Sequence, residues 1–280
     1  MAGRVQSLGL PTNTSFWSSP KDLKNPWNRN GPHTWSSLRH GESARNVAKD
    51  IAKAAGKHSF DLGLRDLETP LTKRGHEQAR DAGRYLSSRY KFDVIYSSPY
   101  HRALQTAEDI TSALRNSPRL VMEERIREIE FGILDGLTGK GIQARFPQEY
   151  KRRKREGKYW YRPLGGESRP DVALRVQSFL GTLTRDYRKK SVLVVCHSVI
   201  VLIFRRLLER WNEEEYLKID REQDVLNCSI TAYRFDSKKG KLILDYYNKV
   251  SHSDGLRKGP RVRARKRKKK RKQKFNGKKT

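Results

Sequence analysis

The apolar run Ser191–Cys196, which reads SVLVVC, constrains the fold of this chain more than any other segment. A short, almost continuous apolar run is typical of a strand that is buried on both faces of a parallel sheet. The run is sharply bounded, because three basic residues precede it and His197 follows it directly. The next apolar pattern, 199–211, has helical spacing. The segment therefore predicts a central strand and the following helix of an α/β protein.

Strands alternate with helical patterns through much of the chain. Further strands are expected at 33–38, 92–98 and 120–121, and a closing hairpin is expected from 227–235 and 241–247. The first of these strands, HTWSSL, is unusually polar for a buried position. The alternation predicts a three-layer α/β/α sandwich with a mostly parallel central sheet.

Apolar residues at helical spacing predict the helices of this sandwich. Thr72 is placed to cap one of them, and Pro99 precedes another. The segment 142–158 is polar and very basic, and we expect it to be a helical excursion from the core. The residues expected on the buried faces of the first helix and of a long later helix are Ala48, Ile51, Ala52 and Ala55, and Val172, Leu174, Val176, Phe179, Leu180 and Leu183.

Composition divides the 280 residues into three parts. Residues 1–32 show no period and are expected to be an irregular extension, whereas 33–250 hold all the predicted elements. Residues 251–280 are expected to be a disordered polybasic tail, because they have too little apolar surface to offset the entropy of ordering. The net charge is +30, and fifteen Lys or Arg without any acid lie in 257–280. Anionic partners are therefore expected: a phosphorylated small molecule at a site, and nucleic acid or another polyanion along 257–279.

Cysteine usage and hydropathy bear on the compartment. The two cysteines, Cys196 and Cys228, make no disulfide framework and favour a reducing intracellular environment. No apolar run is long enough to cross a bilayer, and the N-terminus shows no signal-peptide pattern. A cytoplasmic protein is expected, with nuclear import through the tail as an alternative in a eukaryotic host. A tail that only increases solubility is another alternative.

Histidines follow two of the predicted strands. In Arg39-His40-Gly41 an imidazole stands beside a guanidinium, and the glycine lets the backbone approach an anion. His197 follows the central strand directly. Because ligands of parallel sheets bind at the carboxyl ends of the strands, we expect His40 and His197 to share one site. An Arg-His-Gly tripeptide is common by chance, so this interpretation depends on its partners.

Six segments, in order, resemble the histidine phosphatase superfamily, whose fold is also called phosphoglycerate mutase-like. They are LRHGES, TPLTKRG, IYSSPYHRALQTA, IREIEFGILDG, GGES and VLVVCHS, within residues 36–232. The resemblance implies that His40 is a nucleophile that becomes phosphohistidine, and that Glu128 protonates the leaving oxygen. It also implies a set of residues that bind the phosphoryl oxygens, namely Arg39, Ser43, Asn46, Arg102 and His197. It implies no metal ion and no cofactor.

Phosphoryl transfer explains these residue types. Charge spreads over three equatorial oxygens in the transition state, and arginine forks bind such oxygens in a bidentate way. A nucleophilic imidazole must be neutral, and the neighbouring guanidinium groups favour that form. A positioned carboxylic acid typically contributes about 10²–10⁴-fold to the rate. Glu124 and Glu130 are rivals for this role, but only Glu128 fits the pattern Glu-x-x-aromatic-Gly.

The segment 141–168 is similar to the corresponding part of fructose-2,6-bisphosphatases and related small-metabolite phosphatases. In those enzymes it supplies cations for a distal phosphate, and Arg153 and Lys158 stand at matching places. A tyrosine expected near Gly139 is absent, and Arg169 replaces the tyrosine usual after Gly-Glu-Ser, which argues against fructose 2,6-bisphosphate itself. The long insertion of cofactor-dependent phosphoglycerate mutases is also missing. The predicted function is hydrolysis of a small phosphomonoester such as a sugar phosphate. The alternatives are phosphoglycerate mutase-type transfer and a polyanion-binding protein that acts through its basic tail.

Overall fold

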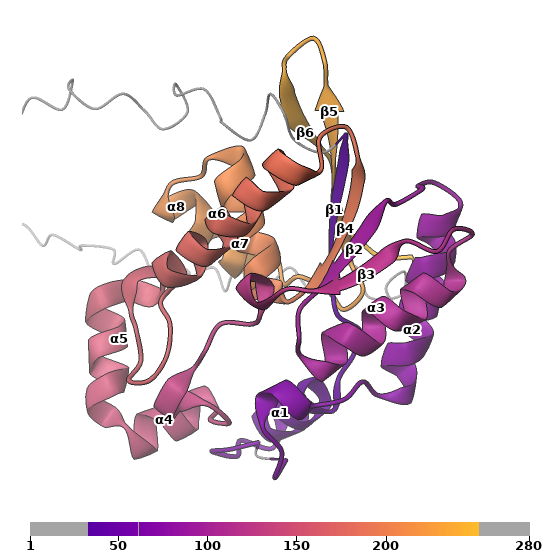
Figure 1. Ribbon diagram of the computed structural model, residues 1–280. Helices are drawn as coiled ribbons and strands as arrows, with labels where there is room; N and C mark the ends of the chain where they lie inside the picture. Colours follow the sequence, from indigo (N-terminus) through magenta and orange to yellow (C-terminus); the bar gives the residue numbers. More distant parts are fainter. Residues whose placement is uncertain (1–32, 61, 252–280) are drawn as a thin grey trace, which may run out of the picture.

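The computed structural model describes residues 33–60 and 62–251. They contain a six-stranded sheet with the strand order β3-β2-β4-β1-β5-β6 (Figure 1). The strands are β1 (Thr34–Arg39), β2 (Val94–Ser97), β3 (Arg119–Met122), β4 (Ser191–Cys196), β5 (Ile230–Asp236) and β6 (Lys241–Lys249). Strands β1 to β4 run parallel, and the predicted hairpin, β5 and β6, continues the sheet in antiparallel fashion. The predicted extension, 1–32, and all but the first residue of the predicted tail, 251–280, lie outside the described residues.

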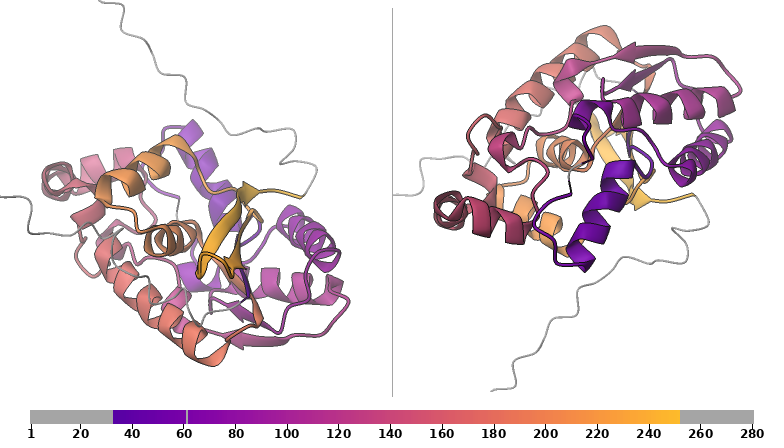
Figure 2. Two further views of the ribbon diagram at one scale, coloured as in Figure 1. Left: turned by 90° about the horizontal axis from the view of Figure 1, so that it is seen from above. Right: turned by 90° about the horizontal axis from the view of Figure 1, so that it is seen from below.

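Helices cover both faces of the sheet (Figure 2). The helices around it are α2 (Lys73–Ser87), α3 (His101–Ala113), α6 (Arg169–Asp186), α7 (Ser198–Glu209) and α8 (Glu213–Glu222). Apolar side chains of α2 and α3 pack against Leu38 and Leu193 on one face. Those of α6 and α7 pack against Trp35 and Val192 on the other. The prediction of a three-layer α/β fold with a mostly parallel sheet is confirmed.

The polar strand β1 is central in spite of its composition. It pairs with β4 on one side and β5 on the other, and Ser36 and Ser37 are fully buried. Trp35 and Leu38 point to opposite faces, since side chains alternate along a strand. The Trp35 ring contacts Phe204 of α7 with 4.7 Å between centroids. These two large side chains anchor the strand that carries His40 at its end.

The basic segment predicted as a helical excursion lies apart from the sheet (Figure 1). It forms α4 (Gly139–Arg145) and α5 (Pro147–Trp160), and the proline begins the second helix. Ile142 of α4 forms a small separate core with the flanking residues Leu134 and Tyr161, whereas Tyr159 of α5 packs in the main core. This arrangement places the basic face of α5 outside the main sandwich.

Three predicted core residues are exposed, and one helix has no counterpart in the prediction. Ile51 on α1 (Ala44–Ala54) is 59% exposed and Ala55 at its C-terminal cap is also exposed, because this helix buries only Ala52. Leu174 is 69% exposed, because it lies about 200° around α6 from the buried Val172. Helix α8 was not predicted from the sequence, since it buries a single residue, Tyr216, and so shows little apolar periodicity.

Two glycines allow the loop after β1 to contact the first turn of α2. A Cβ atom on Gly41 would lie 2.5 Å from the carbonyl oxygen of Gly75, and a Cβ on Gly75 would lie 2.1 Å from that of Glu42. Both neighbours are backbone atoms that cannot rotate away. We expect Gly75→Ala to destabilise the fold by about 1–3 kcal/mol and to lower the Tm by roughly 2–12 °C, measured by circular dichroism. Gly139→Ala is the control, because no atom lies within 4 Å of its added carbon. Equal Tm values for Gly75→Ala and the unmodified protein would contradict this argument.

Candidate active site

The carboxyl ends of β1 and β4 bring two buried histidines together. Arg39 at the end of β1 is the register partner of Cys196 at the end of β4. The backbone N–H of His40 donates to the carbonyl oxygen of Cys196 over 2.9 Å. The rings of His40 and His197 lie 5.1 Å apart between centroids, and these residues are 3% and 0% exposed. The two histidines singled out in the sequence are therefore neighbours.

Hydrogen bonding leaves one nitrogen of His40 available as a nucleophile. Its Nδ1 lies 2.7 Å from the carbonyl oxygen of Gly41, which can only accept a hydrogen bond. Nδ1 therefore carries the proton of the neutral ring, and Nε2 keeps its lone pair. Burial, followed by the positive charges of Arg102 and Arg39, holds the pKa of His40 well below its ordinary value. The ring is thus neutral at neutral pH, which is the form that can attack phosphorus.

His197 has one ring nitrogen occupied and one free. Its Nε2 lies 2.8 Å from the hydroxyl oxygen of Ser98, at the end of β2. Its Nδ1 is buried and has no hydrogen-bond partner within the described residues. Burial is the main reason why the pKa of His197 is also well below its ordinary value. A buried imidazole nitrogen without a protein partner is suited to a polar ligand.

Two arginines border the histidines. Arg39 donates from Nη1 to the carbonyl oxygen of Val225 over 2.5 Å, while its buried Nε has no partner in the described part of the chain. Burial lowers the pKa of Arg39, and the negative charge of Glu128 opposes this change. Arg102, on α3, is 3% exposed and donates to the carboxylate of Asp66 over 2.8 and 3.2 Å. Buried cations of this kind favour an anionic ligand.

Glu128 supplies a buried carboxyl group beside these cations. It is 8% exposed, and its Oε1 accepts a hydrogen bond from the N–H of Ile129 over 3.0 Å. Burial raises its pKa; the Ile129 hydrogen bond and then Arg102 oppose this change. A carboxyl group with a raised pKa can hold the proton that a leaving oxygen needs. Of its rivals, Glu124 is exposed and Glu130 accepts from the Tyr100 hydroxyl over 2.9 Å.

Ser43 and Asn46 lie just beyond His40, at the start of α1. They form a capping box, in which the Asn46 N–H donates to Ser43 Oγ and the Ser43 N–H donates to Asn46 Oδ1. Asn227, which carries no signal in the sequence, donates from Nδ2 to the carbonyl oxygen of His40 over 3.0 Å and to Asn46 Oδ1 over 3.1 Å. The capping role is thus established for both residues, and their contact with phosphate stays a prediction.

Arg153 and Lys158 belong to a second group of charges on α5. Lys158 pairs with Asp220 of α8. Burial lowers the pKa values of Arg153 and Lys158, and the neighbouring charge of Arg169 lowers both further. Arg169 is only 8% exposed, and its Nε has no partner among residues 33–60 and 62–251. Three cations therefore lie around one carboxylate, an excess of positive charge that favours an anion.

Other residues of the site carry no pattern in the sequence. The Thr106 hydroxyl donates to the carbonyl oxygen of Arg102 over 2.6 Å and accepts from the N–H of Gly41 over 3.0 Å. Arg175 donates to the carbonyl oxygen of Glu128 over 3.2 Å and so supports that loop. Thr106 lies inside the matching segment IYSSPYHRALQTA, which is the one signal that could have indicated it. Arg175 and Asp66 are defined only by tertiary contacts.

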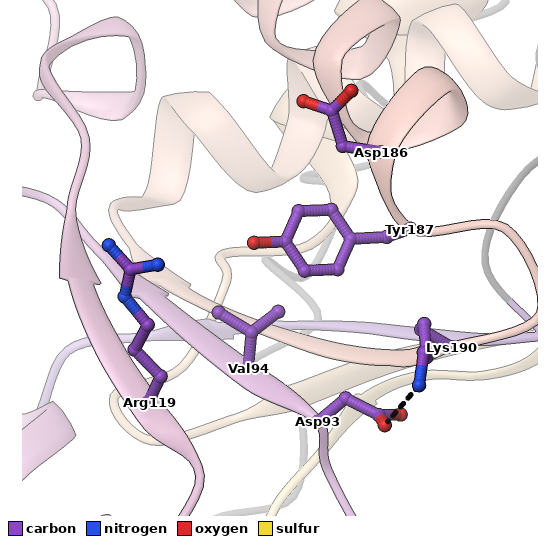
Figure 3. Close-up of a pocket in the computed structure, with 6 residues that line it drawn as sticks. All are labelled: Asp93, Val94, Arg119, Asp186, Tyr187 and Lys190. Carbon is purple, nitrogen blue, oxygen red and sulfur yellow. Dashed lines mark ion pairs between the residues drawn. The ribbon is translucent and has the colours of Figure 1, made fainter.

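Two cavities lie elsewhere in the molecule. The larger, about 300 Å³, is at the amino ends of β2, β3 and β4 (Figure 3). Asp93 and Lys190 form an ion pair of 3.3 Å on its wall, beside Tyr187. The other, about 270 Å³, is lined by residues that include His58 and Arg145. Neither of these two cavities is lined by His40.

No group of three or more His, Cys, Asp or Glu side chains within the described ranges is placed to hold a metal ion. In the same ranges, no helix combines the length and apolar character needed to cross a membrane.

Comparison with known proteins identifies similar chains. A family model described as "Histidine phosphatase superfamily (branch 1)" matches residues 36–248. "Phosphoserine phosphatase 1" of Hydrogenobacter thermophilus is 34% identical over 162 residues, which cover 58% of this chain and 69% of that protein. A "6-phosphofructo-2-kinase/fructose-2,6-bisphosphatase" of Aquarana catesbeiana is 30% identical over 70% of this chain, but the match spans only 37% of that longer protein. Among solved structures, "Mycobacterial hydrolase 2" is 26% identical with a TM-score of 0.61, covering 80% of this chain and 95% of that one.

Proposed function

Because this chain belongs to the histidine phosphatase superfamily, we propose that it hydrolyses a small phosphomonoester through a phosphohistidine formed on His40. The observation that carries this proposal is the state of His40: a buried, neutral imidazole with a free Nε2, beside Arg39 and Arg102. The similarity to a protein named phosphoserine phosphatase 1 also supports a phosphomonoester as substrate.

The proposed reaction has two steps. His40 Nε2 donates its lone pair to phosphorus, the bond to the leaving oxygen breaks, and Glu128 gives that oxygen its proton. Arg39, Arg102 and His197 bind the charge that develops on the equatorial oxygens. The Glu128 carboxylate then takes a proton from water, whose oxygen attacks phosphorus and breaks the phosphorus–nitrogen bond. Inorganic phosphate leaves and His40 is restored.

The direct test is a panel of phosphorylated sugars, glycerates, amino acids and nucleotides assayed for phosphate release. Hydrolysis of one class with a kcat/KM well above the others supports the proposal. The alternative is phosphoryl transfer between positions of a phosphoglycerate, and isomerisation that is faster than phosphate release would favour it. The absence of the long mutase-type insertion between Gly136 and Gly165 favours hydrolysis.

We further propose that the substrate carries a second anionic group, bound by Arg153 and Lys158. The excess of cations around Asp220 supports this part of the proposal. We expect Arg153→Ala to raise the KM of a doubly anionic substrate by about tenfold to a hundredfold, because a hydrogen bond to a charged group is lost. The KM of p-nitrophenyl phosphate, which has no second anion, is expected to stay unchanged. Arg155→Ala is the matched control, since its side chain is 78% exposed on the same helix. Equal effects on both substrates would contradict a second subsite.

Binding of a polyanion by residues 257–279 stays a prediction, as does the cytoplasmic or nuclear location. Deletion of the chain after Gly255 separates the alternatives. A phosphatase retains turnover of small substrates after this deletion. A polyanion-binding protein loses its affinity for nucleic acid together with the steep salt dependence of that affinity.

A further inference from the structure

Asp66 lies at the centre of a chain of charges that ends on a guanidinium of the candidate site. It lies in the 3-10 turn Asp66–Glu68, between α1 and α2. Its carboxylate accepts from Arg102 over 2.8 and 3.2 Å, and its backbone carbonyl oxygen accepts from the same guanidinium over 2.7 Å. On the other side, Arg45 Nε lies 3.0 Å from Asp66 Oδ1, and Arg45 also pairs with Asp135. Two segments far apart in sequence are thereby linked to Arg102.

The three hydrogen bonds use specific protons of Arg102. A guanidinium has five N–H groups in a rigid plane. Nη1 donates to the carbonyl oxygen and to Oδ1 of Asp66, and Nη2 donates to Oδ2. The N–H of Nε and one N–H of Nη2 are left, and these two lie along one edge of the plane. The hydrogen bonds to Asp66 therefore leave Nε unused. The free edge is the one that can bind two oxygens of a phosphoryl group side by side.

The ion pair is largely shielded from solvent, which restricts its motion. The Arg102 side chain is 4% exposed and that of Asp66 is 15% exposed. Thr106 holds the backbone of Arg102 against Gly41 by the two hydrogen bonds described above. Thr106 therefore fixes the backbone of Arg102, and Asp66 fixes its guanidinium.

We propose that Asp66 is a positioning residue, which orients Arg102 so that its Nε–Nη2 edge faces the phosphoryl group. This inference rests on the proposed function. It does not give Asp66 a contact with substrate. The competing interpretation is that the Asp66 carboxylate occupies Arg102 in place of phosphate and must be displaced. The two interpretations predict opposite changes when Asp66 loses its charge. An orienting role predicts weaker binding of phosphate, and a competing role predicts tighter binding.

The test is Asp66→Asn, with Asp109→Asn as the matched control. Asp109 lies on the same helix as Arg102 and pairs with His76 and Arg80. We expect Asp66→Asn to raise the KM of p-nitrophenyl phosphate and the inhibition constant of orthovanadate by about tenfold or more, because the guanidinium loses its orientation. Asp109→Asn is expected to leave both unchanged. A lower KM and a lower inhibition constant in Asp66→Asn would show that the carboxylate competes with phosphate. Unchanged constants would show that Asp66 has no effect on phosphate binding by Arg102. Either result overturns the proposal.

A pH profile gives a readout that a purely structural role would not move. The groups that face Glu128 include the cations Arg102 and Arg39 and the anion Asp66, whose negative charge raises the pKa of Glu128. Removal of that charge should move the alkaline limb of kcat/KM to lower pH in Asp66→Asn. An unmoved limb contradicts the placement of Asp66 beside the site.

Two further measurements keep the result interpretable. If Asp66→Asn does not fold, Arg45→Gln removes the outer partner of Asp66 and should raise the orthovanadate constant several-fold, whereas an unchanged constant overturns the proposal. If the unmodified protein hydrolyses no phosphomonoester, the proposed function fails. Calorimetric binding of orthovanadate by the two aspartate variants then still tests the orientation of Arg102.

Discussion

Replacement of His40 by alanine is expected to lower hydrolysis by roughly 10⁴–10⁶-fold, since removal of one member of a covalent catalytic group is about as costly as removal of all. The unmodified protein, incubated with a ³²P-labelled phosphoester, should yield a phosphoprotein that is labile in acid and stable in alkali. His40→Ala should yield none. The Cys196 thiol is not expected to replace His40 as a nucleophile, because it is fully buried and burial raises the pKa of the thiol well above its ordinary value.

His76→Ala is the control for this experiment. His76 bonds to Asp109 over 2.6 Å on the outer side of α2 and α3 and has no contact with the site described above. It should label and turn over like the unmodified protein. A folded His40→Ala protein that still acquires the label would exclude His40 as the nucleophile.

Glu128→Gln is expected to lower kcat by about 10²–10⁴-fold on alkyl phosphates, which need a proton on the leaving oxygen. The loss on p-nitrophenyl phosphate should be much smaller, because its leaving group departs as a stable anion. Glutamine keeps the shape of the side chain and its acceptor for the Ile129 N–H, so packing at this position changes little. Glu130→Gln and Glu124→Gln test the two rival carboxylates in the same assay. A loss that does not depend on the leaving group would contradict the role of Glu128 as the acid.

The direction of the pH dependence follows from two opposite pKa changes. Glu128 must be protonated, and burial raises its pKa, so activity is present below that raised pKa and is lost as pH rises through it. His40 must be neutral, and burial with Arg102 and Arg39 lowers its pKa, so activity is lost only as pH falls through that lowered value. In Glu128→Gln the alkaline limb of the kcat profile should disappear while the acid limb remains.

Much of the sheet was predictable because its signals are local. The run SVLVVC is buried on both faces as expected, and Thr72 caps α2 through the Gly75 N–H. Faces of single helices were less predictable. Ile51 has helical spacing with Ala48 and Ala55, yet it is exposed, since nothing in a periodic pattern specifies whether a helix packs on a sheet face or beyond the strand ends.

Some residues of the candidate site could likewise be predicted from the sequence, and others could not. His197 could be identified from the sequence because it follows an apolar strand directly. Arg39 and His40 could be identified from the Arg-His-Gly tripeptide within the matching segment LRHGES, since the strand before them is unusually polar. Asp66, Asn227 and Arg175 could not, and Thr106 is indicated only by its place within the matching segment IYSSPYHRALQTA. Each acts through a contact with a residue distant in the chain, and an isolated polar residue carries no signal of its partner.

The sequence by itself determined the succession of strands and of most helices along the chain, the family, and the residues that stand at the strand ends. Only the tertiary structure decided the chemical state of those residues. The tautomer and pKa of His40 depend on a carbonyl oxygen and on two guanidinium groups that folding brings beside it. The orientation of Arg102 depends on Asp66, 36 residues away in the chain. Burial makes these contacts strong, because charges interact far more strongly once water is excluded, and burial exists only in the folded protein.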